Sequence, residues 1–187
     1  YLVIWGEGQR TPLSGIGTHR LKGQRLTVTL NPVDAQFIIG DPILAENIAV
    51  NPRLATDGTD FMVVWVGGVR MVFHDGQVRP EPVNIWLSSI PFNLCWDGTG
   101  YVAAANYSTR PIQNGSELVS YRFNRSGTMI SVSNEINPNS DYKYSVSLTP
   151  KFGGGAQFIW AAAKTFPLID NPNLTGRSIE ADILTAG

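Results

Sequence analysis

Two stretches of the chain repeat one another, Leu54-Ala55-Thr56-Asp57-Gly58-Thr59-Asp60-Phe61 and Leu94-Cys95-Trp96-Asp97-Gly98-Thr99-Gly100-Tyr101. In each copy an Asp-Gly step separates two apolar stretches. Glycine adopts a positive φ without steric cost, and an aspartate side chain accepts hydrogen bonds from the backbone that follows it, so the step predicts a tight turn between two antiparallel strands. The chain is therefore expected to be a tandem repeat of small strand units.

Apolar segments of the same kind recur along the whole chain, at residues 1–5, 61–65, 101–105 and 157–160. Because these segments are apolar almost throughout, we expect both faces of each strand to be covered. A shorter strand is expected before three of them, at residues 53–56, 93–96 and 145–149. The last of these is joined to its partner through Gly153-Gly154-Gly155 instead of an Asp-Gly step.

Two more polar strands are expected after each apolar one, because polar and apolar residues alternate there. The third strand of each unit is predicted at residues 16–21, 69–74, 118–124 and 178–184, ending at glycine turns at Gly23, Gly76, Gly127 and Gly187. The fourth is predicted at 26–30, 83–87 and 129–133. We thus expect one domain, 1–187, with units near 1–48, 49–90, 91–137 and 138–187.

A repeat of roughly 40 to 60 residues with several short strands is typical of a β-propeller, whose single blade cannot bury its own faces. The predicted fold is all-β: a propeller or a propeller segment of about four antiparallel four-stranded blades. The first unit lacks its first strand and the last lacks its fourth, and a closed ring normally completes one blade with both termini. We expect a segment of a larger propeller; a closed four-bladed ring with a three-stranded junction blade is the alternative.

Composition excludes some classes of function. The net charge is −1 with no basic stripe, which argues against nucleic acid as a partner. The apolar runs are far shorter than the roughly 20 residues of a membrane-spanning helix, so no membrane span is expected. Cys95 is the only cysteine, which excludes an internal disulfide, and its neighbours predict a buried thiol. The spacings of zinc ligands are absent, and we expect neither a metal nor a cofactor.

The kinds of polar residue in the chain favour a location outside the cell. Only 16% of the residues are charged, and Asn, Gly, Ser and Thr carry most of the polar character. Glycosylation sequons begin at Asn106, Asn114, Asn124 and Asn173. We expect an extracellular or cell-surface protein, and whether these sequons carry glycans is left open.

The pattern x-Pro-x-Leu-Ala-x-Asp-Gly-Thr-x-Phe-x-Val-Val-Trp resembles the blade repeat of secreted and surface-attached bacterial β-propellers. It is clearest at residues 52–65 and 93–101. Such propellers include adhesins, polysaccharide-binding modules and accessory domains of enzymes, so the resemblance implies a fold and a location and no single activity. The chain departs from the pattern where Ala105 replaces the strand tryptophan, and the Asp-box motif of sialidases is absent.

The predicted turns and loops differ in length at the two ends of the units. Tight glycine turns are expected at one end and longer loops, residues 6–15, 40–51, 106–117, 134–144 and 161–176, at the other. Long loops on a rigid scaffold usually carry binding residues. The residues we select there are Tyr107, Arg110, Asp141 and Asp170, because an aromatic ring beside hydrogen-bonding groups suits a sugar or a peptide.

Other candidate residues have a structural explanation. Trp5, Trp65 and Trp160 occupy equivalent places and are expected to pack between sheets, as is Trp96 beside its turn. His19 and His74 are expected on the surface near the tight turns, where neither is placed as a general base. The turn itself explains the aspartates at 57–60, although calcium ligation there is conceivable. No catalytic residue is assigned.

Three hypotheses for the function follow. The first is a non-catalytic extracellular propeller for adhesion or for binding carbohydrate or protein, completed by the rest of its own propeller or by neighbouring chains. The second is a segment of a propeller glycoside hydrolase or lyase, whose carboxylates would need to lie about 5 to 10 Å apart. The third is a scaffold that polymerises through open sheet edges.

Overall fold

The computed structural model describes residues 1–10, 16–46, 52–65, 68–79, 90–107, 117–133, 142–150, 156–163 and 178–182. These residues form an all-β protein with four small antiparallel sheets, and none of them is helical. The first sheet has the order β1-β2-β3, the second β4-β5-β6, the third β7-β8-β9-β10 and the fourth β11-β12-β13. The strands are β1 (Leu2–Arg10), β2 (Ile16–Arg25), β3 (Phe37–Glu46), β4 (Arg53–Thr56), β5 (Phe61–Trp65), β6 (Gly68–Val72), β7 (Ile90–Trp96), β8 (Tyr101–Tyr107), β9 (Glu117–Phe123), β10 (Met129–Ser133), β11 (Tyr142–Pro150), β12 (Ala156–Ala163) and β13 (Ser178–Asp182).

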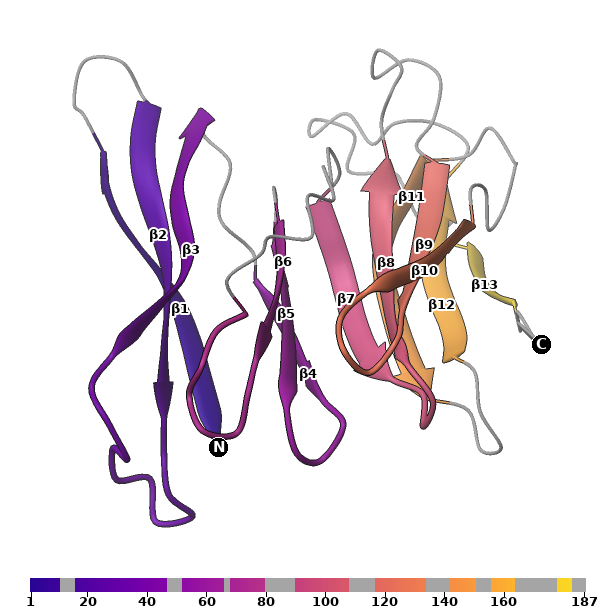
Figure 1. Cartoon of the computed structure of the whole chain (residues 1–187). Coiled ribbons are helices and arrows are strands. Elements are labelled where there is room, and N and C mark those ends of the chain that lie inside the picture. Colours follow the sequence, from indigo (N-terminus) through magenta and orange to yellow (C-terminus); the bar gives the residue numbers. More distant parts are fainter. Residues whose placement is uncertain are drawn as a thin grey trace.

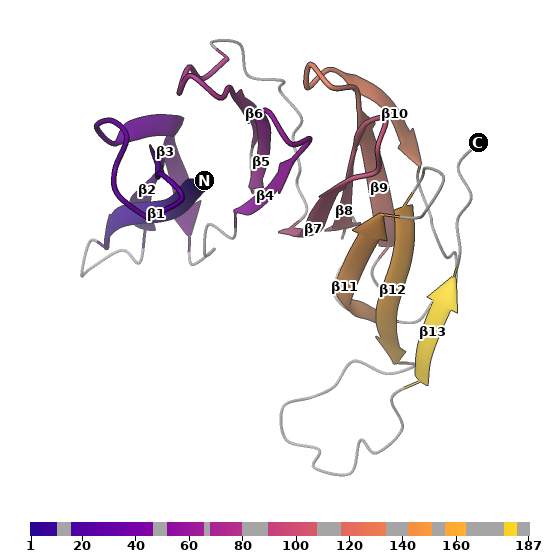
Figure 2. The ribbon, with the colours of Figure 1, turned by 90° about the horizontal axis from the view of Figure 1, so that it is seen from below.

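The four sheets follow one another in chain order along a curved row (Figures 1 and 2). Seen end-on in Figure 2, β4, β7 and β11 lie on the concave side of the row, and β6, β10 and β13 lie on the convex side. β4 contacts β7, and β7 contacts β11, so these inner strands bring neighbouring sheets together. The turns between β4 and β5 and between β7 and β8 lie at the same end of the molecule, the lower end in Figure 1.

The strands predicted around the two Asp-Gly steps are confirmed. β4 pairs with β5 and β7 with β8, in antiparallel registers that place Thr56 opposite Phe61 and Trp96 opposite Tyr101. Gly58 and Gly98 have φ values of 93° and 97°, the left-handed conformation expected of these turns. The predicted strand at 129–133 has the bounds of β10, and those at 118–124, 145–149 and 157–160 are present with ends that differ by up to three residues.

The first sheet differs from the prediction. Gly23 is not in a turn: it lies within β2, between Ile4 and Phe37 on the flanking strands. A side chain there would come within 2.8 Å of Ile39, so the glycine provides close packing inside the sheet. The predicted strand at 26–30 was also wrong. Those residues belong to a turn closed by a hydrogen bond from Thr27 N to Asn31 O, and β3 is the next strand.

Two predicted long loops are also shorter than expected. β1 continues to Arg10 and β3 to Glu46, so much of residues 6–15 and 40–51 is strand. In the fourth sheet β11 begins at Tyr142 and β12 continues to Ala163. The predicted four strands per unit are present in the third sheet alone among the described residues, while the other three sheets have three strands each. The predicted strand at 83–87 and the glycine turn at 187 lie outside the described residues.

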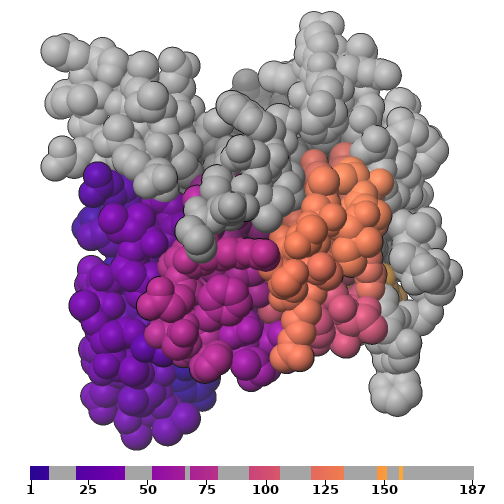
Figure 3. Space-filling model, in the orientation of Figure 1, coloured from indigo at the N-terminus to yellow at the C-terminus, as the bar shows by residue number. Residues whose placement is uncertain are grey.

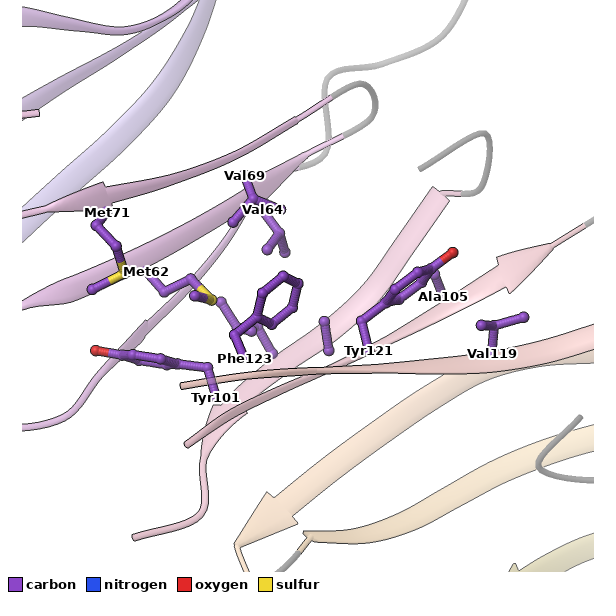
Figure 4. Close-up of a cluster of buried hydrophobic side chains, with 11 residues drawn as sticks. Met62, Val64, Val69, Met71, Tyr101, Ala105, Val119, Tyr121 and Phe123 are labelled. Atoms are coloured by element: carbon purple, nitrogen blue, oxygen red, sulfur yellow. The ribbon is translucent and has the colours of Figure 1, made fainter. Parts of the chain in front are cut away.

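The core consists of interfaces between sheets. Alternate residues of β5 face opposite neighbours: Met62 and Val64 pack toward the third sheet, and Val63 and Trp65 pack toward the first. Figure 4 shows the first interface, where the side chains from the second sheet meet those of the third. Its fully buried members include Met62, Val64, Tyr101 and Phe123. The near-continuous apolar sequence of β5 is explained, because both faces of this strand are covered.

The interface between the first two sheets is built around Trp65, which is 4% exposed. Its indole ring lies against Gly40 of β3 and Gly68 of β6, where added Cβ atoms would come within 2.8 and 2.5 Å of it. The remaining members include Leu2, Leu21 and Ile39. The prediction that Trp65 packs between sheets is confirmed, and the glycines opposite it are the residues that admit a ring of this size.

Candidate functional site

The tight-turn end of the molecule is organised by two equivalent aspartates. Asp57 Oδ1 accepts hydrogen bonds from the backbone N–H groups of Thr59 and Asp60, each at 2.8 Å. Asp97 Oδ1 accepts the same two bonds from Thr99 and Gly100, also at 2.8 Å. Both carboxylate side chains have no exposed surface. The repeat thus preserves a hydrogen-bonded turn as well as a sequence.

Each aspartate also meets an arginine of the third sheet. Arg125 Nε lies 2.5 Å from Asp57 Oδ2 and joins the third sheet to the second. Arg122 Nη2 lies 2.6 Å from Asp97 Oδ2, an ion pair within the third sheet whose geometry is not that of a hydrogen bond. Burial raises the pKa of each carboxyl group, but the backbone donors and the arginine outweigh it, so that the pKa of both Asp57 and Asp97 is lowered. Both groups are therefore charged at neutral pH.

Further contacts on this end connect neighbouring sheets. The hydroxyl of Tyr101 donates to the carbonyl of Asp60 at 3.3 Å. The guanidinium of Arg25, which also pairs with Asp34, donates to the carbonyl of His74. Arg79 donates to the carbonyl of Ser126 in the turn of the third sheet. Each of these side chains thus donates to a backbone carbonyl of a neighbouring sheet or of the turn that follows it.

His74 is exposed in the turn after β6, as predicted, with its Nδ1 3.1 Å from Asp60 Oδ1. The calcium site considered at residues 57–60 has no free carboxylate to offer at Asp57, because both of its oxygens face N–H donors or Arg125. No cluster of three or more metal-type ligands occurs in the described parts of the chain. His19 lies inside β2, opposite Gly8 of β1 and Ile43 of β3, and not beside a turn as predicted. The side chain of His19 is not described.

The four residues predicted to bind a ligand are mostly not placed. Tyr107 is the last residue of β8 and pairs with Glu117 of β9, at the end of the sheet opposite the Asp-Gly turn. Its side chain is not described. Arg110, Asp141 and Asp170 lie outside the described residues. Whether the structure brings these four together is therefore not tested, and their role stays a prediction.

The sequons and the remaining tryptophans are partly placed. Asn124 Oδ1 accepts hydrogen bonds from Ser126 Oγ at 2.8 Å and Thr128 N at 2.9 Å, so this asparagine shapes the turn after β9. Asn106 is part of β8, whereas Asn114 and Asn173 lie outside the described residues, as does Trp86. Trp96 packs edge-on to Tyr101, with ring centroids 4.9 Å apart, which confirms a packing role. Trp5 is half-buried, and the side chain of Trp160 is not described.

The arginines at the tight-turn end were missed in the sequence. Arg122 and Arg125 lie in the strand and turn that follow the second Asp-Gly repeat, and Arg125 reaches an aspartate in another sheet. An unpaired basic residue close to a predicted turn is a weak signal. Only the stacking of the sheets reveals its acidic partner.

The fold and these contacts define a class of protein: an all-β chain of repeated small antiparallel sheets, packed face to face. No protein-family model matches the chain, and no curated protein does. The chain is similar to a crystal structure of a protein of unknown function from Bacteroides caccae, at 12% sequence identity and a TM-score of 0.45. The match covers 86% of this chain and 53% of that one, so the chain spans about half the length of this neighbour. The described residues contain no helix, and therefore none that is long and apolar enough to span a membrane.

Proposed function

We propose that this chain is a segment of a β-propeller that acts outside the cell as a non-catalytic module for adhesion or for binding carbohydrate or protein. The observation that carries this proposal is the curved row of sheets. Their inner strands contact one another in succession, as blades do around an axis (Figure 2). A rigid array of this kind presents the connections at its two ends to ligands.

The ligand-binding end is proposed to be the one opposite the Asp-Gly turns. At the tight-turn end the polar groups already have partners within the protein: those of Asp57 and Asp97 bind their own turns, and that of Tyr101 binds a neighbouring sheet. At the opposite end Tyr107 is the last residue of β8, and Arg110 follows it in the sequence before β9 begins at Glu117. Aromatic and guanidinium groups together suit the faces and hydroxyls of a sugar ring, or a peptide.

An array of immobilised glycans and a panel of soluble polysaccharides test this proposal. The chain is expected to bind at least one of them, and the variants Tyr107→Ala and Arg110→Ala are expected to weaken that binding by about tenfold, the loss of one good contact. Gln77→Ala, an exposed change at the tight-turn end, serves as the matched control. Release of new reducing ends from a bound polysaccharide would contradict the non-catalytic assignment and favour the glycosidase or lyase alternative.

A further inference from the structure

We draw no further inference here: the strongest candidate, the patch of exposed apolar side chains formed by Met129, Ile130 and Val132 on β10 at the outer edge of the third sheet (Figure 3), carries none because nothing in the described part of the structure shows what covers it.

Discussion

At the scale of single residues, the repeated aspartate is a structural charge. Asp57 and Asp97 each gather two backbone N–H donors and one arginine around a carboxylate with no exposed surface. An unpaired buried carboxylate would be strongly destabilising, whereas one that accepts several hydrogen bonds stays ionised. Their repetition in the sequence is thus explained by the turn, without a ligand.

Replacing Asp97 tests this role. Asp97→Ala leaves the N–H groups of Thr99 and Gly100 without their acceptor, and we expect it to lower the free energy of unfolding by about 1 to 3 kcal/mol. Asp97→Asn keeps an acceptor oxygen but loses the charge opposite Arg122, so the loss should be smaller. Urea denaturation at neutral pH measures both. Equal losses would contradict the hydrogen-bond explanation and assign the whole effect to the charge.

The pH dependence of stability follows from the lowered pKa of Asp57 and Asp97. Each carboxylate contributes stability that is fully present above the pKa of an unfolded aspartate, about 3.9, and that is lost as the pH falls through the lower folded pKa. We expect the free energy of unfolding to decrease as the pH falls below about 4. Denaturation curves at a series of acidic pH values check this, and Asp97→Asn should show a weaker decrease than the wild type.

At the scale of elements, the sequence predicts strands best where a turn residue and an apolar strand occur together. Asp57-Gly58 and Asp97-Gly98 locate four strands to within a few residues. The first sheet was harder, because Gly23 provides close packing within a strand and Leu30, a residue that rarely adopts a positive φ, makes the turn. Glycine at a tight contact and glycine at a turn look alike in one sequence. Only the neighbouring strand distinguishes them.

The turn glycines allow the two effects to be separated by experiment. Gly58 and Gly127 both have a positive φ, but an added Cβ meets nothing within 4 Å at Gly58 and lies 2.5 Å from Met71 Cγ at Gly127. Gly58→Ala is expected to cost about 1 to 2 kcal/mol, the strain of the left-handed conformation alone. Gly127→Ala should cost about 1 to 3 kcal/mol more, because Met71 must move. Thermal unfolding of both variants checks the difference, and equal costs would mean that the sheets adjust freely.

At the scale of the whole molecule, the chain is a row of sheets in which each sheet packs on its neighbours. The packing of sheet against sheet follows from apolar strands that are covered on both faces, and the sequence predicts such strands. The ligand-binding residues could not be fixed in the same way. Tyr107 is the last residue of β8, and Arg110, Asp141 and Asp170 lie outside the described residues. The sequence around these four residues has no periodic pattern of the kind that predicts the strands.

A row of sheets should loosen locally, since each sheet depends chiefly on its nearest neighbours. Val63 and Val64 are adjacent in β5, are both 0% exposed, and face the first and the third sheet respectively. Truncating either to alanine should cost about 1 to 3 kcal/mol at its own interface. Leu94 and Trp96 of β7 belong to the cluster between the second and third sheets and Cys95 does not, so strand alternation places the buried thiol of Cys95 on the other face of the third sheet. This thiol therefore reports the opening of that other face, and burial raises its pKa to about 11.

We therefore expect the native Cys95 thiol to react slowly with a thiol reagent near pH 8, where almost none of it is thiolate. Val102→Ala should accelerate this reaction, since Val102 is the buried residue paired with Cys95 on the same face of the third sheet. Val64→Ala, at the interface on the opposite face of the third sheet, should accelerate it much less at the same loss of global stability. Equal acceleration by the two variants would show that the sheets open as a single cooperative unit, and the independence of neighbouring interfaces would then be wrong.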